Sequence, residues 1–105
     1  MQRIELQKTP SQNFTVNLDE HNFELTLRDI GSAMLMDLNV DGKPLAYGLL
    51  VEPNQPVLPY PHLTEYGNFV LLQEGNDYPT WETLGVNSSL YYMTQAEQQE
   101  VANAG

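Results

Sequence analysis

Polar and apolar residues alternate one by one in several short segments of this 105-residue chain. The clearest segment is 22–29, where Phe23, Leu25 and Leu27 alternate with charged or hydroxyl-bearing residues. Because successive side chains of a β-strand point to opposite faces, this period of two is typical of a strand with one buried face. A chain built from such segments must pack the apolar faces of its sheets together.

Further strands are predicted from the same alternation or from short apolar runs. They cover residues 3–7, 13–18, 33–40, 44–51, 68–73 and 89–94. Residues 19–22 read as a tight turn, and Asp41-Gly42 predicts a second hairpin because both of its residues tolerate positive φ. About six to seven short strands favour a mainly β fold, a small antiparallel β-barrel or sandwich.

Four prolines lie between residues 52 and 67 and interrupt the pattern. They remove backbone donors and fix φ, so neither a helix nor a central strand is expected there, and we predict a long ordered loop. The chain length fits one compact domain, which we assign to residues 1–94. The polar C-terminal tail, 95–105, has no aromatic residue and is expected to be flexible or a short helix.

The charge of the chain restricts its partners. Four Lys and Arg stand against fourteen Asp and Glu, a formal net charge of −10. Such a surface repels phosphate backbones and anionic lipids, so we expect no autonomous nucleic-acid binding and no membrane association. The N-terminus lacks the pattern of a signal peptide, which favours a protein made in the cytoplasm. With no Cys, disulfides and thiolate sites are excluded.

One segment matches the first half of a calcium-binding EF-hand loop. Asp37, Asn39 and Asp41 place oxygen ligands at alternate positions before Gly42. The twelfth position is Gly48, where an EF-hand needs a bidentate Glu, and the flanking residues alternate like strands. We therefore interpret the segment as a hairpin turn and predict no metal site.

His21 and His62 are the general-base candidates of the usual kind. No nucleophile elbow and no His-Glu-x-x-His helix accompanies them, and His21 falls in the predicted exposed turn. Most carboxylates occupy strand positions predicted to face solvent, or turns, rather than forming a recognisable pair. We predict that the protein is not an enzyme, with no catalytic residue and no cofactor.

Aromatic residues suggest two candidate interfaces. In Leu58-Pro-Tyr-Pro-His-Leu63, two prolines preorganise the backbone and two amphipathic rings stand beside them, which fits either a rigid connector or a partner contact. Trp81 has Tyr78, Tyr91 and Tyr92 nearby in sequence, and exposed rings of this kind anchor protein interfaces or stack on sugars. The protein-interface candidates are Pro59, Tyr60, Pro61, His62, Leu63, Tyr78 and Trp81.

Two questions stay open at this point. A small carbohydrate-binding module that uses Trp81 and the nearby tyrosines is the alternative function. In the last strand, either Leu90 and Tyr92 or Tyr91 and Met93 face the core, and the period of two alone does not choose between these pairs.

The second half of the chain carries a resemblance. The segments that carry it are Tyr60-Pro-His-Leu63, Gly67-Asn-Phe-Val-Leu-Leu72, Gly75-Asn-Asp77, Pro79-Thr-Trp-Glu-Thr-Leu-Gly85 and Ser89-Leu-Tyr-Tyr-Met-Thr94. In order and spacing the chain resembles the baseplate plug family of phages with contractile tails. The resemblance covers about residues 1–94 and is looser in the first half. This chain departs from the family in being more acidic than expected and in carrying the polar tail, 95–105.

The resemblance implies a structural protein of the virion tail baseplate, assembled in the host cytoplasm. Such a protein plugs or bridges the central hub at the end of the tail tube. The implied partners are the baseplate hub proteins, the C-terminus of the tape measure and the tail tube. Several copies around the tail axis are implied as well.

Overall fold

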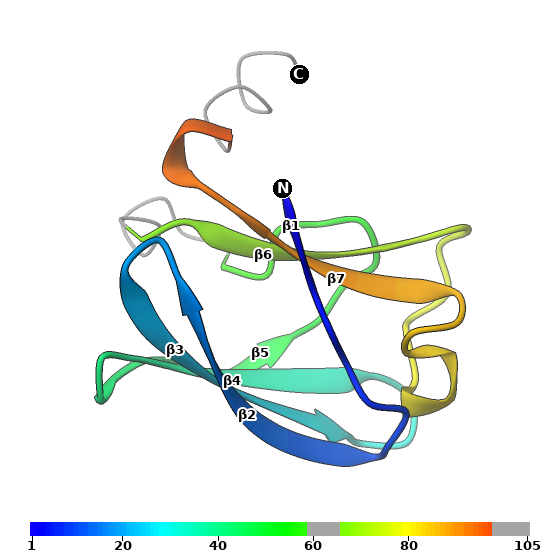
Figure 1. Ribbon diagram of the computed structural model, residues 1–105. Coiled ribbons are helices and arrows are strands. Elements are labelled where there is room, and N and C mark those ends of the chain that lie inside the picture. Colours follow the sequence, from blue (N-terminus) through cyan, green and yellow to red (C-terminus); the bar gives the residue numbers. More distant parts are fainter. Residues whose placement is uncertain (59–65, 98–105) are drawn as a thin grey trace.

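The computed structural model describes residues 1–58 and 66–97, and it confirms the prediction of a mainly β fold (Figure 1). Two antiparallel sheets are present, one in the strand order β1-β7-β6 and one in the order β2-β3-β4-β5. A short 3-10 helix, η2, covers Trp81–Thr83. The strands are β1 (Gln2–Ile4), β2 (Ser11–Leu18), β3 (His21–Asp29), β4 (Met34–Val40), β5 (Lys43–Leu50), β6 (Asn68–Gln73) and β7 (Ser88–Met93).

Both predicted hairpins are confirmed. In the first, Leu18 pairs with His21 across a two-residue turn, Asp19 and Glu20, with φ values of 57° and 67°. The predicted turn, 19–22, was too wide, because His21 and Asn22 already belong to β3. The second turn is Asp41-Gly42, with φ values of 52° and 81°. Positive φ at both central residues is the turn geometry that matches the twist of paired strands.

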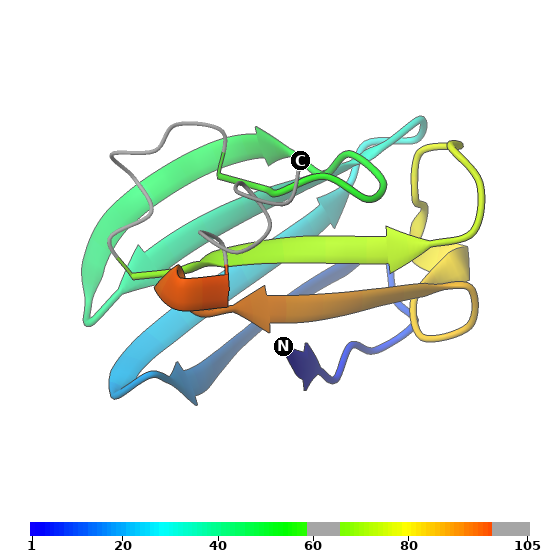
Figure 2. The same cartoon turned by 90° about the horizontal axis from the view of Figure 1, so that it is seen from above.

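The core lies between the two sheets, which face each other in two layers (Figures 1 and 2). Phe23 of β3 contacts rings of the opposite sheet: its centroid lies 5.6 Å from that of Phe69 on β6 and 5.6 Å from that of Tyr92 on β7. All three rings are at most 2% exposed. In the last strand, Leu90 and Tyr92 face this core, while Tyr91 is only partly buried.

The predicted long loop has an ordered first part. Residues 51–58 run beside β6, where the amides of Asn54 and Val57 donate to the carbonyls of Leu71 and Phe69, both at 2.8 Å. Residues 59–65 lie outside the described residues. The return strand begins at Lys43, one residue before the predicted start, so Pro44 is its second residue. It is tolerated because β5 is an edge strand.

The predicted domain ends where the tail begins to turn helical. Residues 95–97 are helical, and Thr94 and Glu97 exchange backbone and side-chain hydrogen bonds of 3.0 and 3.2 Å. This reciprocal pair is a capping box. The N-terminal amino group also contacts the Glu97 carboxylate. Within residues 1–58 and 66–97, no helix is long and apolar enough to cross a membrane.

The aromatic contact between the sheets gives a first testable prediction. We expect Phe23→Ala to lower the free energy of unfolding by about 3–5 kcal/mol, because it removes a buried ring and leaves a cavity. The control is Val86→Ala, at a side chain that is 68% exposed; a change within about 0.5 kcal/mol is expected there. Urea unfolding followed by fluorescence measures both. Equal losses would contradict the assignment of the core.

Candidate protein interfaces

The order of the strands gives the molecule two ends of different character. Because β2 to β5 run up and down in turn, the Asp19-Glu20 and Asp41-Gly42 turns lie at one end (Figure 1). We call this the acidic end, defined by the exposed carboxylates of Asp19, Glu20 and Asp41. The opposite end holds the β3–β4 connection and η2. We call it the apolar end, defined by Ile30, Tyr78, Trp81 and Val86.

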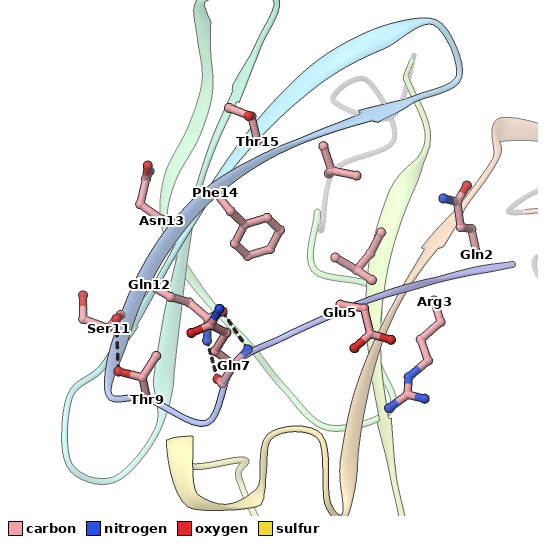
Figure 3. Close-up of a pocket in the computed structure, with 12 residues that line it drawn as sticks. Gln2, Arg3, Glu5, Gln7, Thr9, Ser11, Gln12, Asn13, Phe14 and Thr15 are labelled. Carbon is pink, nitrogen blue, oxygen red and sulfur yellow. Dashed lines mark hydrogen bonds between the residues drawn. The ribbon is translucent and has the colours of Figure 1, made fainter.

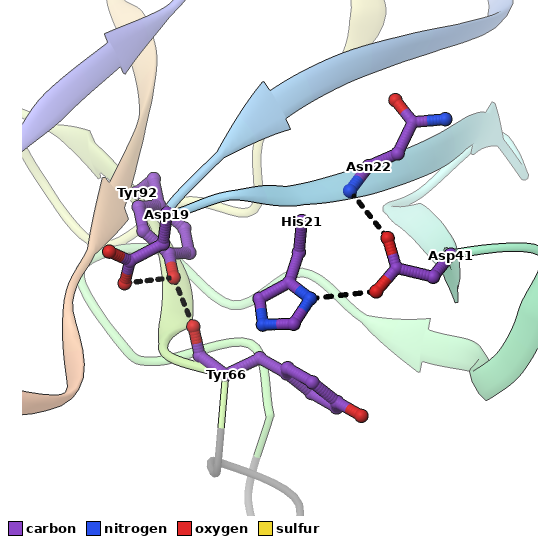
Figure 4. A network of polar contacts seen from close by, with 6 residues as sticks. All are labelled: Asp19, His21, Asn22, Asp41, Tyr66 and Tyr92. Carbon is purple, nitrogen blue, oxygen red and sulfur yellow. Dashed lines mark hydrogen bonds and ion pairs between the residues drawn. The ribbon is translucent and has the colours of Figure 1, made fainter.

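At the acidic end, Asp41 ties two hairpins together (Figure 4). Its Oδ1 accepts a 2.8 Å hydrogen bond from the backbone N–H of Asn22, and its Oδ2 accepts one of 2.7 Å from Nδ1 of His21. The backbone bond first, and the His21 bond second, hold the pKa of Asp41 below its usual value. The ionised carboxylate therefore stabilises the folded state.

A second set of contacts links this end to the core. The Tyr92 hydroxyl donates to Asp19 Oδ2 at 3.2 Å and also contacts the backbone carbonyl of Tyr66. Burial first, and then the Asp19 carboxylate, raises the pKa of Tyr92 far above its usual value, so the hydroxyl stays protonated and remains a donor. Gly67 leaves room for the Tyr92 hydroxyl. Its φ is +109°, and a Cβ at this position would collide with the side chain of Tyr92.

His21 was predicted to be a solvated turn residue, and this was wrong in part. It opens β3, its side chain is 37% exposed, and its ring meets Tyr66 edge to face with centroids 4.8 Å apart. The ring thus lies between Asp41 and Tyr66 (Figure 4). The sequence could not reveal these contacts, because they join positions 20 and 45 residues away along the chain.

The apolar end exposes three large apolar side chains. Ile30 is 54% exposed, Tyr78 47% and Val86 68%. Trp81 lies among the same loops, and its backbone N–H donates to Asp29 Oδ2 at 3.0 Å. Its ring is partly buried against the core, so part of it is available to a partner. Apolar residues grouped within a polar surround are typical of protein contacts.

The predicted interface residues fall into two groups. Tyr78 and Trp81 belong to the apolar end, whereas Pro59, Tyr60, Pro61, His62 and Leu63 lie outside the described residues. Ile30 and Val86 were missed, because a single apolar residue inside a loop carries no periodic signal. Their exposure follows from the way the connections fold over the end of the sheets.

Of the rings proposed for sugar binding, Tyr78 lies with Trp81 at the apolar end, but Tyr92 does not. Tyr92 is 2% exposed and reaches Asp19, while Trp81 contacts Asp29 at the far end of β3. A strand of this length spans about 30 Å. The described structure therefore offers no shared platform of Trp81 and Tyr92.

The half EF-hand segment is a hairpin, as predicted, and protein donors occupy its oxygens. Asp37 Oδ1 accepts from Arg28 at 3.1 Å and from the Gly48 amide at 2.7 Å. Asn39 Oδ1 accepts from the Tyr47 hydroxyl at 2.6 Å. Among the described residues, no group of three or more His, Cys, Asp or Glu is placed to hold a metal ion.

Comparison with protein families gives a match over most of the chain. The family model described as Cyanophage baseplate Pam3 plug gp18 matches residues 1–96, which include both sheets and the start of the C-terminal helix. A search of curated proteins finds no match. The resemblance inferred from the sequence is confirmed by the family match, and its looser first half lies within the matched range.

The Asp41 contacts predict a pH dependence. Because its pKa is lower in the folded state, Asp41 adds stability above its unfolded-state pKa of about 3.9 and loses that contribution as pH falls through the folded value. We therefore expect Asp41→Asn to melt below the parent at pH 7 and to converge toward it by about pH 2.

Thermal unfolding followed by circular dichroism measures this difference. Asp77→Asn is the matched control, because the Asp77 carboxylate makes no hydrogen bond in the described part of the chain. We expect that control to melt like the parent. A gap between Asp41→Asn and the parent that stayed constant from pH 7 to about pH 2 would show that the ionised carboxylate contributes nothing.

Proposed function

Since the chain belongs to the family of the cyanophage baseplate plug, we propose that it plugs or bridges the central baseplate hub at the end of the tail tube. A baseplate plug is a structural protein of the phage virion, so membership implies a place in the tail baseplate and contact with other baseplate or tail components. The proposed partners are the hub proteins, the tape-measure C-terminus and the tail tube. Several copies act around the axis without catalysis, after assembly in the host cytoplasm.

The observation that supports an axial role most directly is the contrast between the two ends. A protein that joins two different neighbours along an axis needs two chemically distinct contact surfaces. Here the turns that carry the carboxylates of Asp19, Glu20 and Asp41 lie opposite an end where Ile30, Tyr78 and Val86 are exposed beside the carboxylates of Asp77 and Glu82. The seven strands between them form a rigid spacer, because their ladders and shared core hold both ends in fixed positions.

In this proposal the apolar end docks into the hub. Fully burying a side chain such as Ile30 or Val86 contributes roughly 1.5–3 kcal/mol to binding, before the cost of immobilisation. The exposed carboxylates of Asp77 and Glu82 lie near these residues in the chain and provide a polar rim. The partner surface would therefore be apolar at its centre and polar at its edge.

The acidic end then faces the tube. At a net charge of −10 the protein repels phosphate, so it can close the tube without binding the DNA that later passes. Its two turns have positive φ at three residues other than glycine, Asp19, Glu20 and Asp41. Such strained positions persist where the surrounding structure holds them; here Tyr92 contacts Asp19, and His21 contacts Asp41.

Complementation tests the docking assignment. In a phage that lacks this gene, Ile30→Asp and Val86→Asp are each expected to lower incorporation of the protein into purified tails about tenfold or more, because a charge would be buried at the hub contact. Quantitative mass spectrometry of the tails measures incorporation. The free proteins should melt like the parent, since both side chains are exposed.

Tyr47→Asp is the matched control. Tyr47 is 61% exposed and lies on β5, away from both ends, and the substitution introduces the same charge. We expect its incorporation to stay within about twofold of the parent. If all three variants entered tails equally well, the apolar end would not be the docking surface.

A further inference from the structure

The two sheets have four edge strands, and three of them are protected. The outer edge of β6 is bonded to residues 53–57 of the preceding loop. The β5 edge contains Pro44 and two register shifts against β4. The β1 edge is only three residues long. Prolines, bulges, short strands and covering loops are the means by which proteins prevent unwanted strand pairing.

The fourth edge, β2, is long and regular, and it is open from Asn13 onward; at its start, Thr9 Oγ1 donates to the Ser11 carbonyl at 3.4 Å. Leu18 and His21 flank a two-residue turn and therefore form a hydrogen-bonded pair. Because hydrogen-bonded pairs alternate along an antiparallel ladder, the backbone groups of the even-numbered residues of β2 bond to β3. The N–H and C=O groups of Asn13, Thr15 and Asn17 therefore point away from the sheet. Within residues 1–58 and 66–97, no group bonds to them. The strand Ser11–Leu18 contains no proline and no charged residue.

A groove runs between this edge and β1 (Figure 3). Its volume is about 630 Å³, and its lining comes from β1, β2 and the connection between them. Phe14 points into it, and Phe14 and Val16 are only partly buried, while Ile4 beside them is 5% exposed. A strand paired with β2 would bring every second side chain over these apolar residues.

The charges beside the groove favour an acidic occupant. Arg3 lines the groove and Lys8 lies in the β1–β2 connection, and neither forms an ion pair with a described residue. Arg28, by contrast, is paired with Asp37. Glu5 is the carboxylate among the lining residues. Arg3 is thus a lining cation without an ion-pair partner among the described residues, and Lys8 lies in the chain between the lining residues Gln7 and Thr9.

We propose that β2 accepts an extended segment of a partner protein as a fifth strand of the four-stranded sheet. The segment has apolar residues at every second position, which pack on Phe14 and Val16, and a carboxylate that reaches Arg3 or Lys8. A second copy of this chain fits less well, because its β2 carries no charge and each copy brings a net charge of −10. This surface is separate from both ends, so the proposal stands without the hub assignment.

The probe is a capped synthetic peptide, Glu-Val-Thr-Val-Thr-Val-Glu, with binding to the full chain measured by isothermal titration calorimetry. We expect it to bind with a Kd below about 1 mM and to lose affinity at least tenfold when its Thr amides are N-methylated or its Glu residues are replaced by Lys. No binding at 1 mM, or equal binding of the methylated peptide, overturns the proposal.

The protein variants test the edge itself. Thr15→Pro removes one outward N–H and is expected to weaken peptide binding at least tenfold, because a proline at an edge donates no ladder bond. Thr15→Val keeps the N–H and the branched shape, so its affinity should stay within about twofold. If Thr15→Pro fails to fold, two charge variants replace it. Arg3→Gln should weaken peptide binding, whereas the control Lys43→Gln should not. A concentration-dependent dimer of the parent that Thr15→Pro abolishes would assign the edge to a second copy instead.

Discussion

The packing of Phe23 against Phe69 and Tyr92 holds the two sheets together, and both surfaces of interest depend on it. Phe23 belongs to the four-stranded sheet, and the other two rings belong to the three-stranded sheet. Phe69 and Tyr92 are themselves in contact, with centroids 5.4 Å apart. The same Tyr92 that buries its ring in the core extends its hydroxyl to Asp19. The strained turn at the acidic end is therefore fixed by the core, and Gly67 provides the space that this arrangement requires.

The fold divides its polar and apolar surfaces unevenly, which is informative because the family is one of assembly proteins. At one end the carboxylates of Asp19 and Asp41 accept hydrogen bonds from specific donors, and at the other Ile30, Tyr78 and Val86 are exposed beside the carboxylates of Asp77 and Glu82. One side of the layers is closed by the chain's own loop, and the other has an unpaired strand beside a groove. In a member of the baseplate plug family, such features fit the proposed contacts with other baseplate or tail components.

Much of the fold could be predicted from the sequence, because a period of two is a local property. The strand over 68–73 and the Asp41-Gly42 turn were correct to the residue. The inward face of β7 could not be predicted, since Leu90 and Tyr92 were chosen by their contacts with the opposite sheet. The length of the first turn could not be predicted either. Glu20 adopts positive φ in the structure, but glutamate rarely does so, and its presence therefore did not indicate a two-residue turn. The candidate interfaces were the least predictable part. The arrangement of both sheets decides that Ile30 and Val86 are exposed and that β2 is an edge strand, and this arrangement is not a local property of the sequence.

A map of the intact baseplate by electron cryo-microscopy tests the central claim most directly. We expect density for this two-sheet domain on the tail axis, with the apolar end buried against hub proteins and the acidic end toward the tube. A domain found away from the axis, or one on the axis whose Ile30 and Val86 face solvent, would contradict it.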